Sequence, residues 1–206
     1  MYNIPYFKAG DEKEVIAFMH AHPFIILCGA DPLGQPVATH VPVLFEERDN
    51  KLFLRAHVMR KQDHTLAFGD NQKVLAIFYG PHTYVSASLY ENKQIASTWN
   101  YQAVHAKGVL KFLNEDGLLQ IITDLTEKFE NNPHSPSLVQ KMDKEYVSRM
   151  MQAIIGFEIE IQSIEHVFKL SQNRDEKSYH NIHDSLSSGD PDAKAIAAEM
   201  KKRQHP

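Results

Sequence analysis

The chain has a single cysteine, Cys28, among its 206 residues, so it cannot form a disulfide within itself. Cys28 ends the apolar run Phe24–Cys28. A cysteine in such a run is typical of a small buried hydrophobic side chain and not of a nucleophile. The sequence therefore predicts neither a disulfide-stabilised fold nor cysteine catalysis.

Positive charge is also scarce. The 22 Lys and Arg residues are outnumbered by 26 Asp and Glu residues, which gives a net charge of −4. A dedicated DNA-binding domain usually carries a basic face, and the chain shows no helix-turn-helix pattern. We interpret its compact basic cluster, Lys201-Lys202-Arg203, as favourable charge on the last turn of a helix. Composition thus argues against direct contact with DNA.

Long apolar runs are missing. None approaches the roughly 20 residues that span a bilayer. The segment Met1–Pro5 has no basic region followed by an apolar stretch, as a secretion signal would. We therefore expect a cytoplasmic, soluble protein with no membrane partner.

Several catalytic and metal motifs are absent. The chain has 12 histidines, but the close pairs His20/His22 and His180/His183 lack a carboxylate or cysteine at zinc spacing, so we expect no metal site. No Gly-x-Ser-x-Gly elbow occurs, which leaves triad hydrolysis unsupported. No Gly-rich phosphate loop follows a strand, which argues against a parallel Rossmann-type sheet.

What the chain does have is a series of strand signals followed by helical periodicity. A short helix capped by Asp11 opens it, and strands are expected at 24–28, 37–47, 51–57, 74–79, 82–88 and 98–113. Helical stripes at 118–129 and 146–154 precede a strand from Gly156, in which apolar and polar residues alternate. A helical tail follows, with Asp190 as its cap and Pro191 at the first helical position. This order predicts a mainly β, α+β fold, a small antiparallel barrel with helices outside, with a sandwich as the alternative. We expect one domain over residues 1–174 and a C-terminal helical extension over 175–206.

Three strand-associated stretches carry polar and aromatic residues where a plain barrel strand would carry aliphatic ones. They are Gly80–Tyr90, Ser97–Gly108 and Lys169–Arg174. Burying hydroxyl, amide or imidazole groups without partners costs about 1–3 kcal/mol per group. These stretches therefore indicate a ligand-binding barrel.

The strand Lys51–His57 brings basic groups together. Arg55 and His57 face the same side, and Lys61 follows in the adjoining loop. Arginine offers a bidentate fork and lysine a point charge, so the three could hold a phosphate. A solvated polar strand face is the other interpretation, and on this segment alone it is favoured.

Two further segments suit a planar ring. Trp99 and Tyr101 could stack on such a ring, while Asn100 and Gln102 could satisfy its carbonyls and nitrogens; core packing is the alternative. The segment Lys169–Asn173 could rim a pocket or could be a turn closed by its own side chains. Neither alternative is excluded by the sequence.

At these residues the chain closely resembles the PaiB-like family of FMN-binding negative transcriptional regulators, in order and to about Arg174. The most specific matching pieces are Trp99-Asn100-Tyr101 and Lys169-Leu170-Ser171-Gln172-Asn173. Other matches are Thr39–Pro42, the Leu54–His57 strand, Gly80–Ser86, Val104–Ala106 with Gly108, and Ile155–Phe157.

The resemblance implies a split β-barrel of the kind seen in pyridoxamine phosphate oxidase relatives, assembled as a homodimer with FMN at the subunit interface. It implies phosphate contacts from Arg55, His57 and Lys61, and positions near the ring system for Thr39 and His40. It also implies that the pocket is completed, from either subunit, by Trp99, Asn100, Lys169, Ser171 and Gln172.

The chain departs from the family pattern in two places. Many relatives read Ser-Pro-Ser-Trp-Tyr where this chain has Ser86–Tyr90, and the loop Val58–Lys61 lacks the usual Ala-Asn-Pro character. Three functions remain open: an FMN-binding regulator, a flavin-dependent oxidoreductase acting on a small molecule, and a haem- or flavin-binding sensor without turnover. The resemblance supports FMN for the first two. The sequence does not choose between them.

Overall fold

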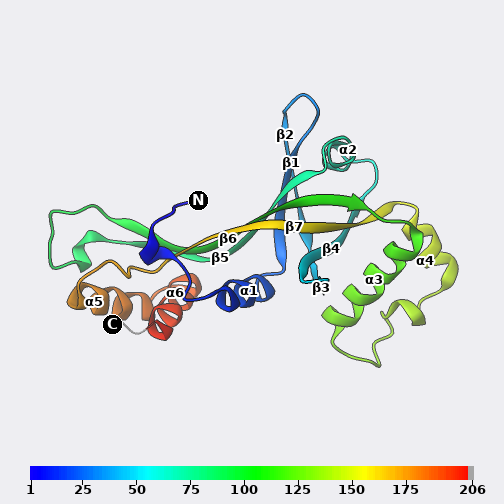
Figure 1. The fold of residues 1–206 in the computed structure, drawn as a ribbon. Helices are drawn as coiled ribbons and strands as arrows, with labels where there is room; N and C mark the ends of the chain where they lie inside the picture. The colour runs from blue at the N-terminus through cyan, green and yellow to red at the C-terminus, as the bar shows by residue number, and fades with distance from the viewer. Residues whose placement is uncertain (204–206) are drawn as a thin grey trace. The chain divides into compact units, whose positions relative to one another are not determined.

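The computed structural model describes residues 1–203, and Figure 1 labels its elements along the ribbon. The strands are β1 (Phe24–Ala30), β2 (Pro36–Pro42), β3 (Leu44–Arg48), β4 (Lys51–Met59), β5 (Lys73–Val85), β6 (Thr98–Phe112) and β7 (Ile154–Lys169). The α-helices are α1 (Glu12–Ala21), α2 (Asp63–Asp70), α3 (Glu115–Glu130), α4 (Lys144–Met151), α5 (Glu176–Ser187) and α6 (Pro191–Lys202). Short 3-10 helices are η1 (Pro5–Phe7), η2 (Ala87–Leu89) and η3 (Val139–Lys141).

The strands of residues 1–203 form one seven-stranded sheet in the order β2-β1-β5-β6-β7-β4-β3. The pairs β1–β2, β1–β5, β3–β4 and β4–β7 are antiparallel. The predicted mainly β, α+β fold is confirmed, with a single sheet in place of the two layers of a sandwich.

The described chain divides into two compact units. Unit 1 contains Met1–His22, Tyr79–Val104 and the C-terminal part from Glu165, and unit 2 contains Pro23–Phe78 and His105–Ile164. The strands β5, β6 and β7 contribute residues to both units.

Unit 2 is built on two hairpins. In the first, Phe24 pairs with Pro42 and Ala30 with Pro36. In the second, Arg48 pairs with Lys51 across Asp49 and Asn50, whose φ angles of 51° and 58° are those of a tight hairpin turn. The extended segment expected at 37–47 is broken at Val43, whose N–H donates to the Pro23 carbonyl at 2.9 Å outside the ladder.

Unit 2 also contains a glycine in close contact with neighbouring backbone and the long helix α3. Gly108 of β6 lies against the backbone of β7, and a Cβ at this position would overlap the Glu160 carbonyl oxygen. Glycine is therefore required for close approach of backbone inside β6. Helix α3 begins at the Asn114 cap and buries Ile121 and Leu125 against Leu44.

Helix α2 was not predicted from the sequence. It has only eight residues, its N-cap Gln62 makes no side-chain cap hydrogen bond, and a short connection separates it from β4. Thr65 ties it back by donating from Oγ1 to the Met59 carbonyl at 2.7 Å. A tertiary contact therefore stabilises a helix whose own sequence signal is weak.

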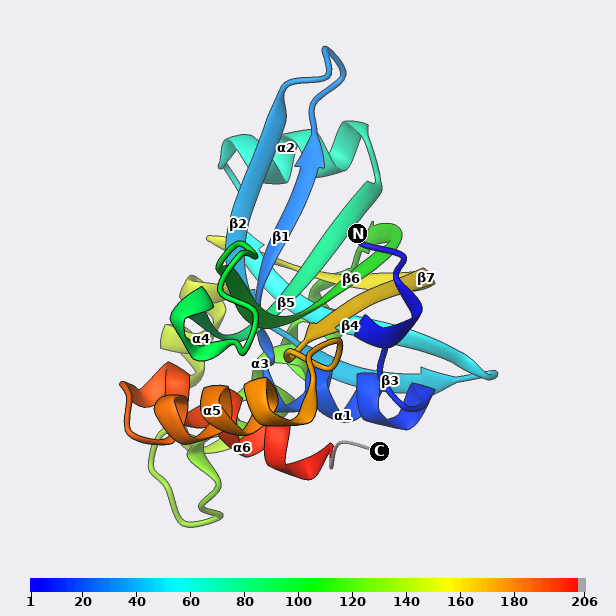
Figure 2. The ribbon, with the colours of Figure 1, turned by 90° about the vertical axis from the view of Figure 1, so that its left-hand side faces the viewer.

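Unit 1 holds α1 and the two C-terminal helices. As predicted, the Asp11 carboxylate caps α1 by accepting from Glu14 N–H at 2.9 Å, and Asp190 caps α6 with Pro191 at its first position. Figures 1 and 2 both show α5 and α6 side by side. Their apolar residues share one core with parts of β5, η2 and β7; its members include Val85, Tyr90, Leu170, Tyr179, Ile182, Ile196 and Met200. Separate strands were expected at 74–79 and 82–88, but the structure has one continuous strand there, β5, which ends at Val85.

Candidate functional site

The residues expected to bind a ligand are distributed over both units. Unit 2 carries Thr39, His40, Arg55, His57 and Lys61, and unit 1 carries Trp99, Asn100, Lys169, Ser171 and Gln172. Each set is described by the contacts inside its own unit.

Arg55 is held by two carboxylates. Its Nε lies 2.7 Å from Glu46 Oε2 and its Nη2 lies 2.8 Å from Asp124 Oδ2, and only 19% of its side chain is exposed. Gln120 on α3 donates to the other Asp124 oxygen at 2.6 Å. A phosphate at Arg55 would therefore compete with two anions already in place, and the guanidinium links β3 and β4 to α3.

His57, two residues further along β4, has an unused polar atom. Its Nδ1 is buried and has no hydrogen-bond partner among residues 1–203. Burial lowers the pKa of this imidazole, which favours the neutral ring. A buried group without a partner costs about 1–3 kcal/mol, so a bound molecule that offers a hydrogen bond at this position would be favoured.

Lys61 lies outside that region, in the connection between β4 and α2. It lines a cavity of about 390 Å³ together with Arg60 and, from the end of α4, Arg149. Arg149 was not predicted as a site residue, because its separation of 88 positions from Lys61 hides a proximity that only the fold creates. The sequence showed only the two successive basic residues, Arg60 and Lys61, that follow the end of β4.

Thr39 and His40 lie on the edge strand β2. Thr39 pairs with Leu27 and is half-buried, while the exposed His40 pairs with Ile26. The His40 ring is stacked near the exposed Phe24 ring at a centroid distance of 6.2 Å. Within unit 2 these two residues form part of the accessible edge of the sheet.

Trp99 belongs to a group of exposed rings in unit 1, here called the aromatic face and made of Tyr79, His82, Tyr84 and Trp99. Trp99 lies 6.0 Å from His82 and 5.9 Å from Tyr84 between ring centroids, and His82 lies 5.1 Å from Tyr79. Trp99, Tyr84 and Tyr79 are 52%, 52% and 48% exposed. Contiguous exposed rings of this kind mark binding surfaces more often than ordinary monomer surface.

The neighbouring Asn100 points the opposite way and is buried. Its Nδ2 donates to Ser171 Oγ at 2.9 Å and also lies 4.0 Å from Met200 Sδ. Ser171 is itself buried and has a φ angle of 64°. The pair is thus satisfied inside the protein and stabilises a strained turn.

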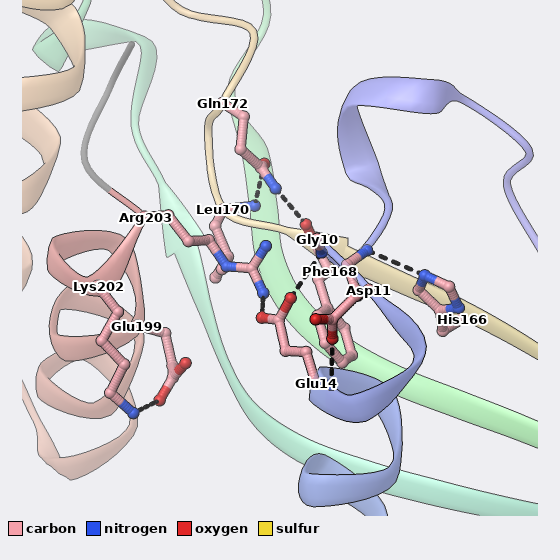
Figure 3. A network of polar contacts seen from close by, with 11 residues as sticks. Gly10, Asp11, Glu14, His166, Phe168, Leu170, Gln172, Glu199, Lys202 and Arg203 are labelled. Atoms are coloured by element: carbon pink, nitrogen blue, oxygen red, sulfur yellow. Dashed lines mark hydrogen bonds and ion pairs between the residues drawn. The ribbon is translucent and has the colours of Figure 1, made fainter.

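Gln172 and Lys169 also have partners in unit 1. Gln172 accepts from Leu170 N–H at 2.7 Å and donates to the Phe168 carbonyl at 2.5 Å, as Figure 3 shows. Lys169 Nζ donates to Thr98 Oγ1. Burial, and next the charge of Arg174, lower the pKa of Lys169. Gln172 thus closes the turn with its own side chain, whereas Ser171 is bonded to Asn100 on β6.

The basic end of α6 is engaged locally. Arg203 forms an ion pair with Glu14 of α1, and Lys202 pairs with Glu199, as Figure 3 shows. These contacts agree with the interpretation of this cluster as charge at a helix end. Among residues 1–203 no cluster of three or more metal-ligating side chains occurs, and no helix there is long and apolar enough to cross a membrane.

Comparison with known sequences gives a consistent picture. Residues 1–163 match the family described as "Putative FMN-binding domain". The "Protease synthase and sporulation protein PAI 2" of Bacillus subtilis is 33% identical over 204 residues, which cover 98% of each chain. An uncharacterized protein of Saccharomyces cerevisiae is 29% identical over 122 residues, which cover 55% of this chain and 72% of that protein.

Solved structures share the fold at low sequence identity. The FAD and heme binding protein from Mycobacterium smegmatis aligns with a TM-score of 0.57 and 12% identity over 78% of this chain and 72% of that one. A protein titled as a putative 5-nitroimidazole antibiotic resistance protein from Bacteroides thetaiotaomicron aligns with a TM-score of 0.53 and 11% identity over 77% and 84%. The predicted split-barrel fold is confirmed.

Proposed function

Since the chain belongs to the PaiB-like family of FMN-binding domains, with FMN as the cofactor, we propose that it is a regulatory flavoprotein that holds FMN at the interface of a homodimer. The family match over residues 1–163 carries this proposal. Bound FMN would supply a redox-active planar ring system and a phosphate group. The residues of the chain fit both parts of such a molecule.

The phosphate end is assigned to unit 2. Lys61 offers an unpaired ammonium group in a cavity, and His57 offers a buried, unused Nδ1. Thr39 and His40 are proposed to lie near the ring system from the edge of the sheet. Arg55 is proposed to act mainly by positioning β4, because its guanidinium is held by Glu46 and Asp124.

The proposed ring contacts come from Trp99 and Lys169 of either subunit. Trp99 offers an exposed indole for stacking, and the ammonium of Lys169 is held at Thr98 on the same strand as Trp99. Asn100, Ser171 and Gln172 support this part of the site by keeping the turn after β7 closed. The aromatic face thus combines apolar area with nearby hydrogen-bonding groups, as ligand sites commonly do.

A second copy of the chain is the proposed cover of the aromatic face. Three of its rings are about half exposed, and aromatic residues are enriched in the cores of protein interfaces. At micromolar concentration, the molar mass measured by light scattering is expected to be that of a dimer. A monomer that binds FMN fully at that concentration would show the interface to be wrong while leaving FMN binding intact.

The regulatory role is supported by the Bacillus subtilis relative, which is named as a protease synthase and sporulation protein. The net charge of −4 argues against direct DNA contact, so regulation would act through a partner. Binding to DNA measured at several salt concentrations tests this, because phosphate contacts make affinity fall steeply with salt. Sequence-specific binding to DNA whose affinity falls steeply with salt would contradict the indirect role.

The absorption spectrum of protein purified without added cofactor is the first experiment. Bands of oxidised flavin are expected, and a Soret band or no visible absorption, even after incubation with FMN, would overturn the proposal. The oxidoreductase alternative is tested by adding reduced nicotinamide cofactor to the loaded protein. Rapid bleaching of the flavin bands would favour an enzyme over a regulator.

A further inference from the structure

The cavity beside Lys61 is formed by two segments that are far apart in the sequence. One is the β4–α2 connection with Arg60, Lys61 and Gln62, and the other is the end of α4 with Arg149 and Gln152. Backbone contacts fix the two segments together. The Arg60 N–H donates to the Ala153 carbonyl at 2.9 Å, and Met59 pairs with Ile154 in the β4–β7 ladder. The positions of the cavity walls are therefore set by the sheet.

The charge of this cavity is uncompensated. Its lining includes Arg60, Lys61 and Arg149 and no carboxylate. Among residues 1–203, none of these three cations takes part in an ion pair, and the one contact of the Arg149 charge is with the Tyr146 ring at 5.8 Å. Elsewhere in unit 2, Arg48, Lys51 and Arg55 are each paired with acidic side chains.

Three unpaired cations that share a cavity create a positive potential there, which attracts an anion. Arginine presents a planar fork of donors and lysine a compact charge, a combination that suits the oxygens of a phosphate. The amides of Gln62 and Gln152 add neutral donors at the same cavity. A volume of about 390 Å³ admits a phosphate with a small attached group.

We propose that Arg60, Lys61 and Arg149 form a phosphate-binding site in which α4 supplies an essential cation. The phosphate has two possible sources, the terminal phosphate of FMN and a separate phosphate such as inorganic phosphate or a small phosphate ester. In the first case the site rests on the proposed function and refines it, since Arg60 and Arg149 take the place of the already paired Arg55. In the second case the site is independent of the flavin.

The test compares ligands with and without a phosphate. Arg149→Gln and Arg60→Gln remove charge from the cavity, and Lys111→Gln removes an exposed charge on β6 outside it. FMN and riboflavin are titrated by flavin fluorescence, and inorganic phosphate by calorimetry. Denaturant midpoints establish that the variants are folded, and surface substitutions of this kind are expected to leave them almost unchanged.

If the site holds the FMN phosphate, each cavity variant weakens FMN binding about tenfold or more and leaves riboflavin binding unchanged. If it holds a separate phosphate, the variants weaken binding of inorganic phosphate by a similar factor while FMN binding matches that of Lys111→Gln. Either result supports the site, and both affinities should fall as salt is added.

The site is overturned if both cavity variants bind FMN, riboflavin and inorganic phosphate as Lys111→Gln does. In that outcome normal FMN binding by the wild-type chain would leave the proposed function standing. Conversely, the wild-type chain could bind inorganic phosphate but no FMN, with phosphate binding lost in the cavity variants. That result would support the site and contradict the proposed function.

Discussion

Asn100 and Ser171, 71 positions apart in the chain, form a buried side-chain pair at 2.9 Å, with Asn100 fully buried and Ser171 2% exposed. The pair joins β6 to the turn that follows β7, next to the exposed Trp99. It shows that the specific Trp-Asn-Tyr and Lys-Leu-Ser-Gln-Asn segments meet in space within unit 1. Their shared role is to hold this turn, because Asn100 of one segment and Ser171 of the other are turned inward.

Removing one member of this pair should destabilise the protein. Asn100→Ala leaves the Ser171 hydroxyl buried without its partner, and a loss of about 1–3 kcal/mol in the free energy of unfolding is expected. Urea denaturation followed by circular dichroism measures it. Ser88→Ala, at an exposed position of η2, is the control and should change stability by less than about 0.5 kcal/mol. Equal stability of both variants would contradict a structural role for Asn100.

Arg55 and Lys61 should differ in what their loss affects. Arg55→Ala leaves Glu46 and Asp124 without their shared cation, so the free energy of unfolding should fall by about 1–3 kcal/mol and FMN binding should weaken along with it. Lys61→Ala should weaken FMN binding several-fold with stability unchanged, because Lys61 has no ion pair in the described chain.

Fluorescence titration and denaturation of the same samples separate these two effects, with Lys201→Ala as the control for loss of a distant positive charge. Unchanged flavin affinity in both Arg55→Ala and Lys61→Ala would refute the assignment of the phosphate to this part of unit 2.

Trp99→Ala should weaken both flavin binding and dimerisation. The exposed indole is in contact with His82 and Tyr84, and truncating an aromatic residue at the centre of an interface commonly costs about 2 kcal/mol or more. Analytical ultracentrifugation and FMN titration measure the two effects. Leu33→Ala, at an 86% exposed position in the β1–β2 hairpin, is the matched control for loss of exposed apolar area. A variant that dimerises and binds FMN like the control would exclude the aromatic face.

His57 should make stability depend on pH. Burial lowers the pKa of its ring below the ordinary value of 6.5. As the pH falls below 6.5, the unfolded chain therefore takes up a proton at this ring before the folded chain does. The free energy of unfolding decreases progressively from pH 6.5 down to the lowered pKa of the folded chain. The urea concentration at the midpoint of unfolding should decrease when the pH is lowered from about 7.5 to about 5.5.

His57→Gln should reduce that fall, whereas His134→Gln, in an exposed loop, should leave it as in the wild type. An identical pH dependence in the two variants would show that the ring of His57 does not titrate differently in the folded chain.

Local patterns were enough for most elements. Asp11 and Asp190 marked helix starts, and the alternation after Gly156 marked β7, because caps and strand periodicity depend on neighbouring residues. Helix α2 and the break at Val43 were missed. Both depend on contacts outside the local segment, from Thr65 to Met59 and from Val43 to Pro23.

For the site, residue types in order were enough to identify the family and the cofactor. The fold was needed to show that Arg55 is neutralised by Glu46 and Asp124, that Asn100 is turned toward Ser171, and that Arg149 joins Arg60 and Lys61. The physical reason is that the charge available to a ligand depends on which side chains lie within a few ångströms. In this chain those neighbours come from segments tens of residues away.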